Sequence, residues 1–467
     1  MIDLRSFLKS AGDAVYRPAQ PLSVMREITA LQHALDAAER YPVVCVERPL
    51  LADGRESALA VVCNLTASRE LTARSLGFSG HREAARSFAE RTGRPIAPIV
   101  VGRGEAPVQA VVHQGAACDL TQLPVLTQHT LDPGPYLTAA HATTYDPDTG
   151  IDNTAIQRCW VKGPRRTSYY PYPESHNDRN VRKFWARGEA CPIAFWIGHH
   201  PAVSIAAQAK LAYPQSHWGA VGGMTGEPLR LVPSITHGEK IMVPADAEIV
   251  IEGFVPPGVI EADGPFGEYT GYMGPQTTSP VCEITAITRR ADALYHDYAS
   301  GLRDMLVPDN MAMEGLLFEL VRAVAPSLLN VHVPVSGRRF HAYLQFGNPA
   351  PGEAREAIAA ALAYRRVKAA FAVDSDVDIF SDSEMLWAIA TRVQWHRDTL
   401  LRGGMSGSTL DPSWPAGADS ISKMGIDATV PAGAARPFAP RMAVPQAALE
   451  KAGRLLGGVS HASWPRV

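Results

Sequence analysis

The spacing of apolar positions marks out an α/β segment in residues 1–110. Apolar side chains recur three and four positions apart through residues 1–45 and again through 66–92, which is the period of amphipathic helices. Between them, Y-P-V-V-C-V-E and A-L-A-V-V-C-N-L are short apolar runs with the length of single strands. We therefore expect helices and a few strands in this segment.

Residues 111–295 show a different pattern, with many short strands. Y-L-T-A-A-H-A-T-T-Y leads into the turn D-P-D-T-G and is followed by N-T-A-I-Q-R-C-W-V, which predicts a β-hairpin. Two further strands are predicted at 247–255 and 279–290. A partly closed β-barrel is the simplest architecture for so many short strands.

Helix and strand patterns alternate after residue 295. A linker helix is predicted within 296–325, and a C-terminal α/β domain is predicted for 326–467. Strand, helix, strand and helix patterns follow one another at 340–346, 354–364, 371–380 and 385–393. Beyond about residue 403 the chain is rich in Gly and Pro, so we expect an irregular tail. The predicted fold class is α+β, in three parts.

Composition narrows the range of functions. The formal net charge is −3, and no cluster of Lys or Arg indicates binding to nucleic acid or to an anionic membrane. No apolar run is long enough for a membrane span, and the first residues do not resemble a secretory signal. The six cysteines form no C-x-x-C pair, which favours free buried thiols over a disulfide framework. We expect a cytoplasmic protein.

The common short motifs for nucleotide binding, zinc binding and serine hydrolysis are missing, so a catalytic site would have to combine dispersed residues. Four segments carry candidate side chains: N-T-A-I-Q-R (153–158), P-E-S-H (173–176), S-H-W-G-A-V-G-G-M-T-G (216–226) and D-G-P-F-G-E (263–268). Each of these alone is more often structural than functional. Strand alternation also places Asn153 and Arg158 on opposite faces, so a bulge would be needed to bring them to one site.

Together these segments resemble the UbiD family of decarboxylases, which use prenylated flavin mononucleotide (prFMN). The resemblance extends in the same order through 219–232, 243–253, 263–272, 385–392 and 423–429. It implies a UbiD-like three-part architecture: an N-terminal α/β segment, a central flavin-binding split β-barrel and a C-terminal α/β domain used in oligomerisation. A homodimer or homohexamer is therefore expected.

The resemblance also implies cofactors and a substrate class. Family members bind the prFMN phosphate through a divalent metal, typically Mn²⁺, with K⁺ nearby, and a flavin prenyltransferase supplies the cofactor. They decarboxylate aromatic, heteroaromatic or other α,β-unsaturated acids, and some run in reverse. Asn153 and His176 match metal ligands, Arg158 matches the catalytic Arg, and Glu268 matches the second catalytic acid. The expected cofactor contacts also include Ala155, Ile156, Glu174 and Ser175.

These residue types suit the chemistry. An Arg can hold a carboxylate through two hydrogen bonds, and a carboxylic acid with a raised pKa can return a proton to carbon after CO₂ leaves. The first acid of the family is Glu, but here it is the shorter Asp263. Three explanations compete: Asp263 remains the proton donor, Glu268 takes over, or Glu261 folds back into the site.

Two further positions differ from the family pattern. His217 stands where a metal-binding Glu is expected, which removes one negative charge and shifts the metal preference from Mn²⁺ towards Fe²⁺, Co²⁺ or Zn²⁺. Alternatively, other groups hold the phosphate. Ser383 stands where a Lys that contacts the flavin phosphate is expected. These changes fit a divergent subfamily, and they also fit a paralogue that has lost decarboxylation.

The expected substrate pocket combines the residue after Glu268 with the start of the linker helix. Its side chains are Tyr269, Met305, Leu306, Asn310 and Met311. They suit a flat apolar ring with one polar contact, although the last four are equally suited to helix packing. The alternatives to a decarboxylase are a non-catalytic flavin- or metal-binding subunit of a carboxylase complex, and a flavin oxidoreductase.

Overall fold

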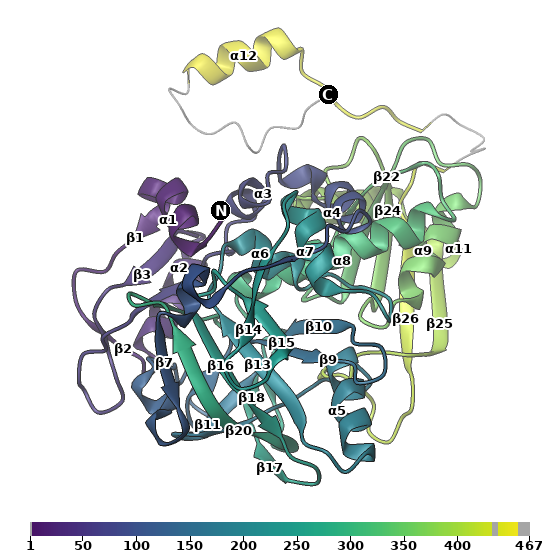
Figure 1. Cartoon of the computed structure of the whole chain (residues 1–467). Coiled ribbons are helices and arrows are strands. Elements are labelled where there is room, and N and C mark those ends of the chain that lie inside the picture. The colour runs from purple at the N-terminus through teal and green to yellow at the C-terminus, as the bar shows by residue number, and fades with distance from the viewer. Residues whose placement is uncertain (1, 432–437, 456–467) are drawn as a thin grey trace.

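The computed structural model describes residues 2–431 and 438–455 and shows three connected parts (Figure 1). The N-terminal segment lies at the upper left of the view, the β-rich middle region lies below, and the C-terminal domain lies to the right. The mixed α and β content and the curved central sheet confirm the predicted fold class. Helix α8 (Arg303–Arg322) connects the barrel to the C-terminal domain.

The N-terminal segment contains a four-stranded sheet in the order β1-β3-β5-β21. Its strands are β1 (Val15–Tyr16), β3 (Val43–Val46), β5 (Ala60–Cys63) and β21 (Leu294–His296). Its helices are α1 (Leu4–Ala11), α2 (Glu27–Ala37), α3 (Arg69–Ser75) and α4 (Ala84–Thr92). Because β21 comes from the end of the barrel region, the N-terminal segment is closed by residues far away in sequence.

The central sheet is antiparallel and runs in the order β10-β9-β13-β16-β20-β12-β11-β8. These strands are β10 (Asp152–Ile156), β9 (His141–Tyr145), β13 (Cys191–Ile197), β16 (Ile249–Val255), β20 (Thr277–Arg289), β12 (Arg166–Ser168), β11 (Cys159–Gly163) and β8 (Tyr136–Leu137). The predicted hairpin is confirmed by the pairing of β9 with β10. Strands β7 (Val111–Gln114) and β17 (Ile260–Asp263) also pair with β20.

Three helices and a small sheet cover the barrel. The helices are α5 (His176–Ala186), α6 (Pro201–Ala206) and α7 (His217–Thr225), and both α5 and α7 pack against β10. The small sheet has the order β15 (Gly238–Pro244), β14 (Arg230–Ser234) and β6 (Ile99–Val100). The first residues of α5 and α7 therefore lie beside the same barrel strand.

The C-terminal domain has a five-stranded sheet in the order β22-β23-β24-β26-β25. Its elements are β22 (Leu328–His332), β23 (His341–Phe346), α9 (Glu353–Ala363), β24 (Ala369–Asp374), α10 (Asp382–Arg392), α11 (Trp395–Asp398), β25 (Thr399–Met405) and β26 (Ile421–Asp427); α12 (Gln446–Leu455) follows. The prediction of an irregular tail from residue 403 is wrong for β26, an inner strand of this sheet.

The apolar pattern of the sequence does not predict β26, because two residues of this strand make tertiary contacts. Gly425 leaves no room for a side chain, since an added Cβ would lie 2.1 Å from Ile358 Cγ2 on α9. Lys423 is 1% exposed, and its ammonium donates to the carbonyl oxygens of Leu362 and Tyr364 at 2.8 and 2.9 Å. A Lys and a Gly therefore interrupt an apolar pattern that would otherwise predict a strand.

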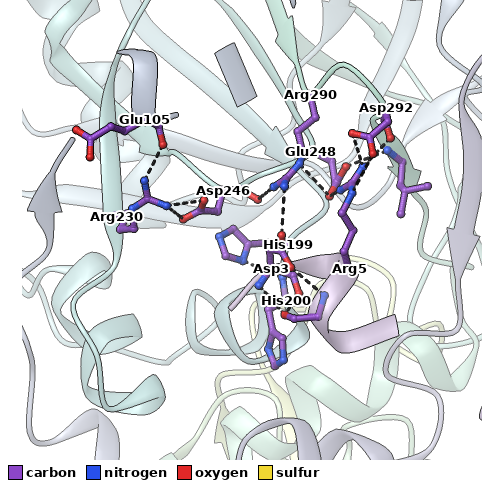
Figure 2. Close-up of polar contacts among 12 residues, drawn as sticks. Asp3, Arg5, Glu105, His199, His200, Arg230, Asp246, Glu248, Arg290 and Asp292 are labelled. Carbon is purple, nitrogen blue, oxygen red and sulfur yellow. Dashed lines mark hydrogen bonds and ion pairs between the residues drawn. The ribbon is translucent and has the colours of Figure 1, made fainter. Parts of the chain in front are cut away.

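Ion pairs attach α1 to the barrel (Figure 2). Glu248, directly before β16, has a fully buried side chain and pairs with Arg5, whose Nη2 also donates to the carbonyl oxygen of Asp292 at 2.6 Å. Arg290 lies 3.2 Å from Asp3, the N-cap of α1. The N-terminal helix is thus held by charges at the end of the barrel sheet.

All six cysteines are buried and free, as predicted. In the described part of the chain, no helix combines the length and apolar character needed to cross a bilayer.

Candidate active site

Arg158 and two carboxylates form the centre of the site. The strand pattern is interrupted because β10 ends at Ile156 and β11 begins at Cys159, so Arg158 lies in the short connection between two strands. Its Nε and Nη2 donate to Asp263 Oδ2 at 3.1 and 3.0 Å, and its Nη1 donates to Glu268. The three residues that the sequence analysis grouped as catalytic therefore meet in the structure.

Asp263 is completely buried and accepts hydrogen bonds on both oxygens. Besides the two bonds from Arg158 to Oδ2, Oδ1 accepts from Ser168 at 2.9 Å and from Tyr136 at 3.1 Å. The Tyr136 hydroxyl in turn accepts from the Gly264 N–H at 2.9 Å. Sequence analysis did not identify Tyr136 and Ser168, because they lie in separate strands and in no motif.

Glu268 has a different environment. Its side chain is 15% exposed, and Arg158 is its ion-pair partner. Burial raises the pKa of Glu268, and the charges of Arg158 and Arg339 oppose that rise without cancelling it. Arg158 remains cationic: burial alone would lower its pKa, but Glu268 and Asp263 hold it above the ordinary value. Glu268 thus combines partial exposure with a raised pKa, which suits a group that carries a proton.

Glu261 does not enter the site. Its carboxylate pairs with Lys162 at 2.9 Å and Arg166 at 2.6 Å, and these cations occupy both of its oxygens. The hydrogen bond from Lys162 lowers the pKa of Glu261. The third explanation for the short Asp263, in which Glu261 folds back, is therefore wrong.

The predicted metal ligands come from three adjacent elements. Asn153 is buried on β10, and His176 and His217 are the first residues of α5 and α7. The two His ring centroids lie 6.3 Å apart. Burial lowers the pKa of His176 and brings that of His217 to about 3, so both rings are neutral at pH 7. His217 Nδ1 is buried with no hydrogen-bond partner among the described residues.

This donor set fits a divalent metal in type, because neutral imidazoles and an amide oxygen are ordinary ligands for such ions. It carries no negative charge of its own. Asp152, the neighbouring acid, is already engaged: Oδ2 accepts from the N–H groups of His217 and Trp218 at 2.8 and 3.1 Å. Within the described ranges, no three His, Cys, Asp or Glu side chains converge as a metal site.

The other predicted cofactor contacts are divided between two locations. Ala155 and Ile156 are half-buried on β10, which pairs only with β9 in the described sheet and so leaves one backbone edge unpaired. Ser175 is the N-cap of α5, and Glu174 before it is exposed. Ser383 is exposed in the first turn of α10, in the C-terminal domain.

The predicted substrate pocket is only partly open. Leu306, Asn310 and Met311 are fully buried in α8: Asn310 donates to the Val333 carbonyl at 3.0 Å, and Met311 belongs to an apolar core. Tyr269 and Met305 lie nearer the interface with the C-terminal domain. The Tyr269 hydroxyl donates to Ser408 at 2.7 Å. A cavity of about 520 Å³ lies beside the segment that follows Glu268, lined by Thr270, Tyr272, Arg338, Phe340, Lys368 and Asp411.

Two family profiles match this chain. Residues 99–302 match the UbiD profile, described as the 3-octaprenyl-4-hydroxybenzoate carboxy-lyase Rift-related domain, and residues 310–428 match the C-terminal domain of the same carboxy-lyase. Over 438 residues the chain is 30% identical to the anhydromevalonate phosphate decarboxylase of Methanothermobacter thermautotrophicus, covering 93% of this chain and 98% of the relative.

Solved structures show the same similarity. HmfF from Pelotomaculum thermopropionicum, a UbiD-class enzyme in complex with FMN, superposes with a TM-score of 0.89 at 34% identity, over 96% of this chain and 98% of that one. An evolved dimeric form of HmfF in complex with prFMN gives 0.86 at 33%, over 97% and 98%. The 3,4-dihydroxybenzoic acid decarboxylase AroY of Klebsiella pneumoniae gives 0.86 at 25% identity, over 97% and 99%.

Proposed function

Because the chain belongs to the UbiD family and is a carboxy-lyase, we propose that it removes CO₂ from an aromatic or heteroaromatic acid without net oxidation, with prFMN as cofactor. One observation carries the proposal: a buried Arg158 is held between two carboxylates of unequal environment. The similarity to HmfF, whose structures contain FMN and prFMN, supports the choice of cofactor. AroY, a decarboxylase of an aromatic acid, supports the substrate class.

The three charged residues have separate roles in this proposal. Arg158 binds the substrate carboxylate, and Asp263 fixes the guanidinium in place. When bound, prFMN supplies an electron sink for the charge left on carbon as CO₂ departs. The bond between that carbon and the carboxylate breaks, and Glu268 then delivers a proton to form the new C–H bond. Glu268 suits this role because burial raises its pKa.

The cofactor would be held from both ends. Asn153, His176 and His217 would bind a divalent metal beside the phosphate, with K⁺ nearby. Mn²⁺ is the family's usual ion. Because His217 replaces a carboxylate with a nitrogen donor, the metal preference shifts towards Fe²⁺, Co²⁺ or Zn²⁺. The unpaired edge of β10 at Ala155 and Ile156 would face the flavin ring. A flavin prenyltransferase would supply the cofactor, and we expect a homo-oligomer.

The decisive test starts from protein co-expressed with a flavin prenyltransferase. We expect prFMN and a divalent metal in near-stoichiometric amount, measured by mass spectrometry and elemental analysis. The Arg158→Ala variant should keep the cofactor but lose CO₂ release, because among the described residues Arg158 is the side chain that bridges Asp263 and Glu268.

Arg166→Ala is the matched control, because Arg166 pairs with Glu261 on β17, outside the site, and its loss should leave turnover unchanged. Normal turnover by Arg158→Ala would contradict the assignment. Oxidation of NAD(P)H by the flavin-loaded protein, with no release of CO₂ from any acid, would favour the oxidoreductase alternative. In a third arm, His217→Ala should reduce metal and cofactor content together; unchanged content would exclude His217 as a ligand.

A further inference from the structure

A largely buried group of four charged residues lies where the barrel region, helix α8 and the C-terminal domain meet. Asp309 is on α8, Lys210 follows α6, Arg339 precedes β23 and Arg366 follows α9. Arg339 Nη1 and Arg366 Nη1 lie 3.1 and 2.8 Å from Asp309 Oδ2, and Lys210 Nζ donates to Oδ1. We call this group the Asp309 cluster. It brings three cations to a single carboxylate.

The Asp309 cluster has an excess of positive charge. Burial alone would raise the pKa of Asp309, but Arg339, Lys210 and Arg366 hold it well below its ordinary value, so the carboxylate stays ionised. One negative charge thus faces three basic side chains. Excess charge away from solvent is costly unless an opposite charge compensates it. An anion bound to the cluster would provide that compensation.

The cluster also has hydrogen-bond donors that Asp309 does not use. Arg339 is only 7% exposed; Nη1 faces Asp309, Nη2 donates to the Met305 carbonyl at 3.0 Å, and Nε is buried without a partner among the described residues. The side chains of Lys210 and Arg366 each remain 22% exposed. Arg339 Nε is therefore an unsatisfied donor within the cluster, and the partly exposed Lys210 and Arg366 are the side chains through which an acidic ligand would reach it.

Arg339 lies on the side of the catalytic acid. The Arg339 guanidinium carbon is 4.9 Å from the ring centroid of Tyr269, the residue after Glu268, and its charge lowers the pKa of Glu268 against the effect of burial. The cluster thus reaches the part of the site that carries the proton donor.

We propose that Arg339 and Arg366 bind a second acidic group of the substrate, a carboxylate or a phosphate remote from the carboxylate that leaves as CO₂. This inference rests on the proposed function and narrows its substrate to acids with two anionic groups. The flavin phosphate is the other source of an anion here. The position of Arg339 beside Tyr269 and the Met305 carbonyl favours the substrate.

The test compares acids with one and two anionic groups. Benzoate, isophthalate, terephthalate and 4-phosphonobenzoate are titrated calorimetrically into cofactor-loaded protein. We expect at least one of the dianionic acids to bind about tenfold more tightly than benzoate, which corresponds to about 1.4 kcal/mol. Arg366→Gln should remove this preference while cofactor content and benzoate affinity stay unchanged. Asp309 keeps Arg339 and Lys210 as partners in that variant.

Arg365→Gln is the matched control, because Arg365 stacks on Tyr172, 4.2 Å from the ring centroid, and should retain the preference. If the unaltered protein bound no dianionic acid more tightly than benzoate, the proposal would be overturned. Loss of cofactor from Arg366→Gln would assign the cluster to binding of the flavin phosphate. If only the free energy of unfolding changed, the cluster would have a structural role and the proposal would be wrong. Because binding is measured directly, these outcomes are independent of whether any acid is decarboxylated.

Discussion

At the scale of single residues, the two carboxylates beside Arg158 are not equivalent. Asp263 is completely buried and accepts from Arg158, Ser168 and Tyr136, so its oxygens are already engaged in holding the guanidinium. Glu268 is partly exposed, and burial raises its pKa. We propose that this division explains the short Asp263: the buried acid would position Arg158, and the longer, more accessible acid would deliver the proton.

Replacing Glu268 should therefore slow the proton step. We expect Glu268→Gln to lower kcat by about 10²–10⁴-fold, the usual contribution of a positioned general acid. Incorporation of solvent deuterium into the product should fall in parallel. Glu261→Gln is the control, because Glu261 is paired with Lys162 and Arg166 and should turn over normally. Equal activity of the two variants would remove Glu268 from the mechanism.

The pH dependence of kcat follows from the same residue. Glu268 donates only when protonated, so the rate should be level at low pH and fall about tenfold per pH unit above its pKa. Since burial raises that pKa, the fall should begin above the range of a free Glu. The residual kcat of Glu268→Gln should not fall with pH in this range. If the same fall persisted in the variant, the titration of another group would cause it.

At the scale of elements, strand β26 depends on a close approach to helix α9. An Ala at position 425 would place Cβ 2.1 Å from Ile358 Cγ2, so α9 or the strand has to shift. We expect Gly425→Ala to reduce the free energy of unfolding by about 1–3 kcal/mol, the usual cost of overpacking. Chemical denaturation measures this change.

Gly403→Ala, on the neighbouring strand β25, is the matched control. An added Cβ at position 403 meets no atom within 4 Å, so the free energy should change by less than about 0.5 kcal/mol. Similar losses in both variants would show that intrinsic strand preferences, and not contact with Ile358, determine the effect.

At the scale of the whole molecule, a few buried charges hold the parts together. Arg5 pairs with the fully buried Glu248, whereas the pair of Arg17 with Glu47 is 50% and 64% exposed. We expect Arg5→Ala to cost about 1–3 kcal/mol, because a buried carboxylate loses its main cation. Arg17→Ala should cost less than about 1 kcal/mol. Urea unfolding compares them; equal effects would contradict the role of Glu248 as an anchor.

Sequence periodicity predicted those elements whose apolar pattern follows from one buried face. The β9–β10 hairpin, the long strand β20 and helix α8 belong to this group. Strand β26 was missed because Lys423 and Gly425 satisfy contacts with residues about 60 positions away. The strand alternation assumed for Arg158 does not apply, since β10 ends at Ile156 and Arg158 lies in the connection to β11.

The sequence by itself determined the family and the three-part architecture, because ordered motifs and local periodicity are properties of the chain. It also predicted which charged residues are catalytic. Only the tertiary structure decided which acid is engaged and which is accessible, because burial and hydrogen bonds from Tyr136 and Ser168 come from separate strands. The Asp309 cluster likewise appears only on folding. Its charges are more than 150 positions apart in the chain at their extremes, and electrostatic interactions depend on distance in space.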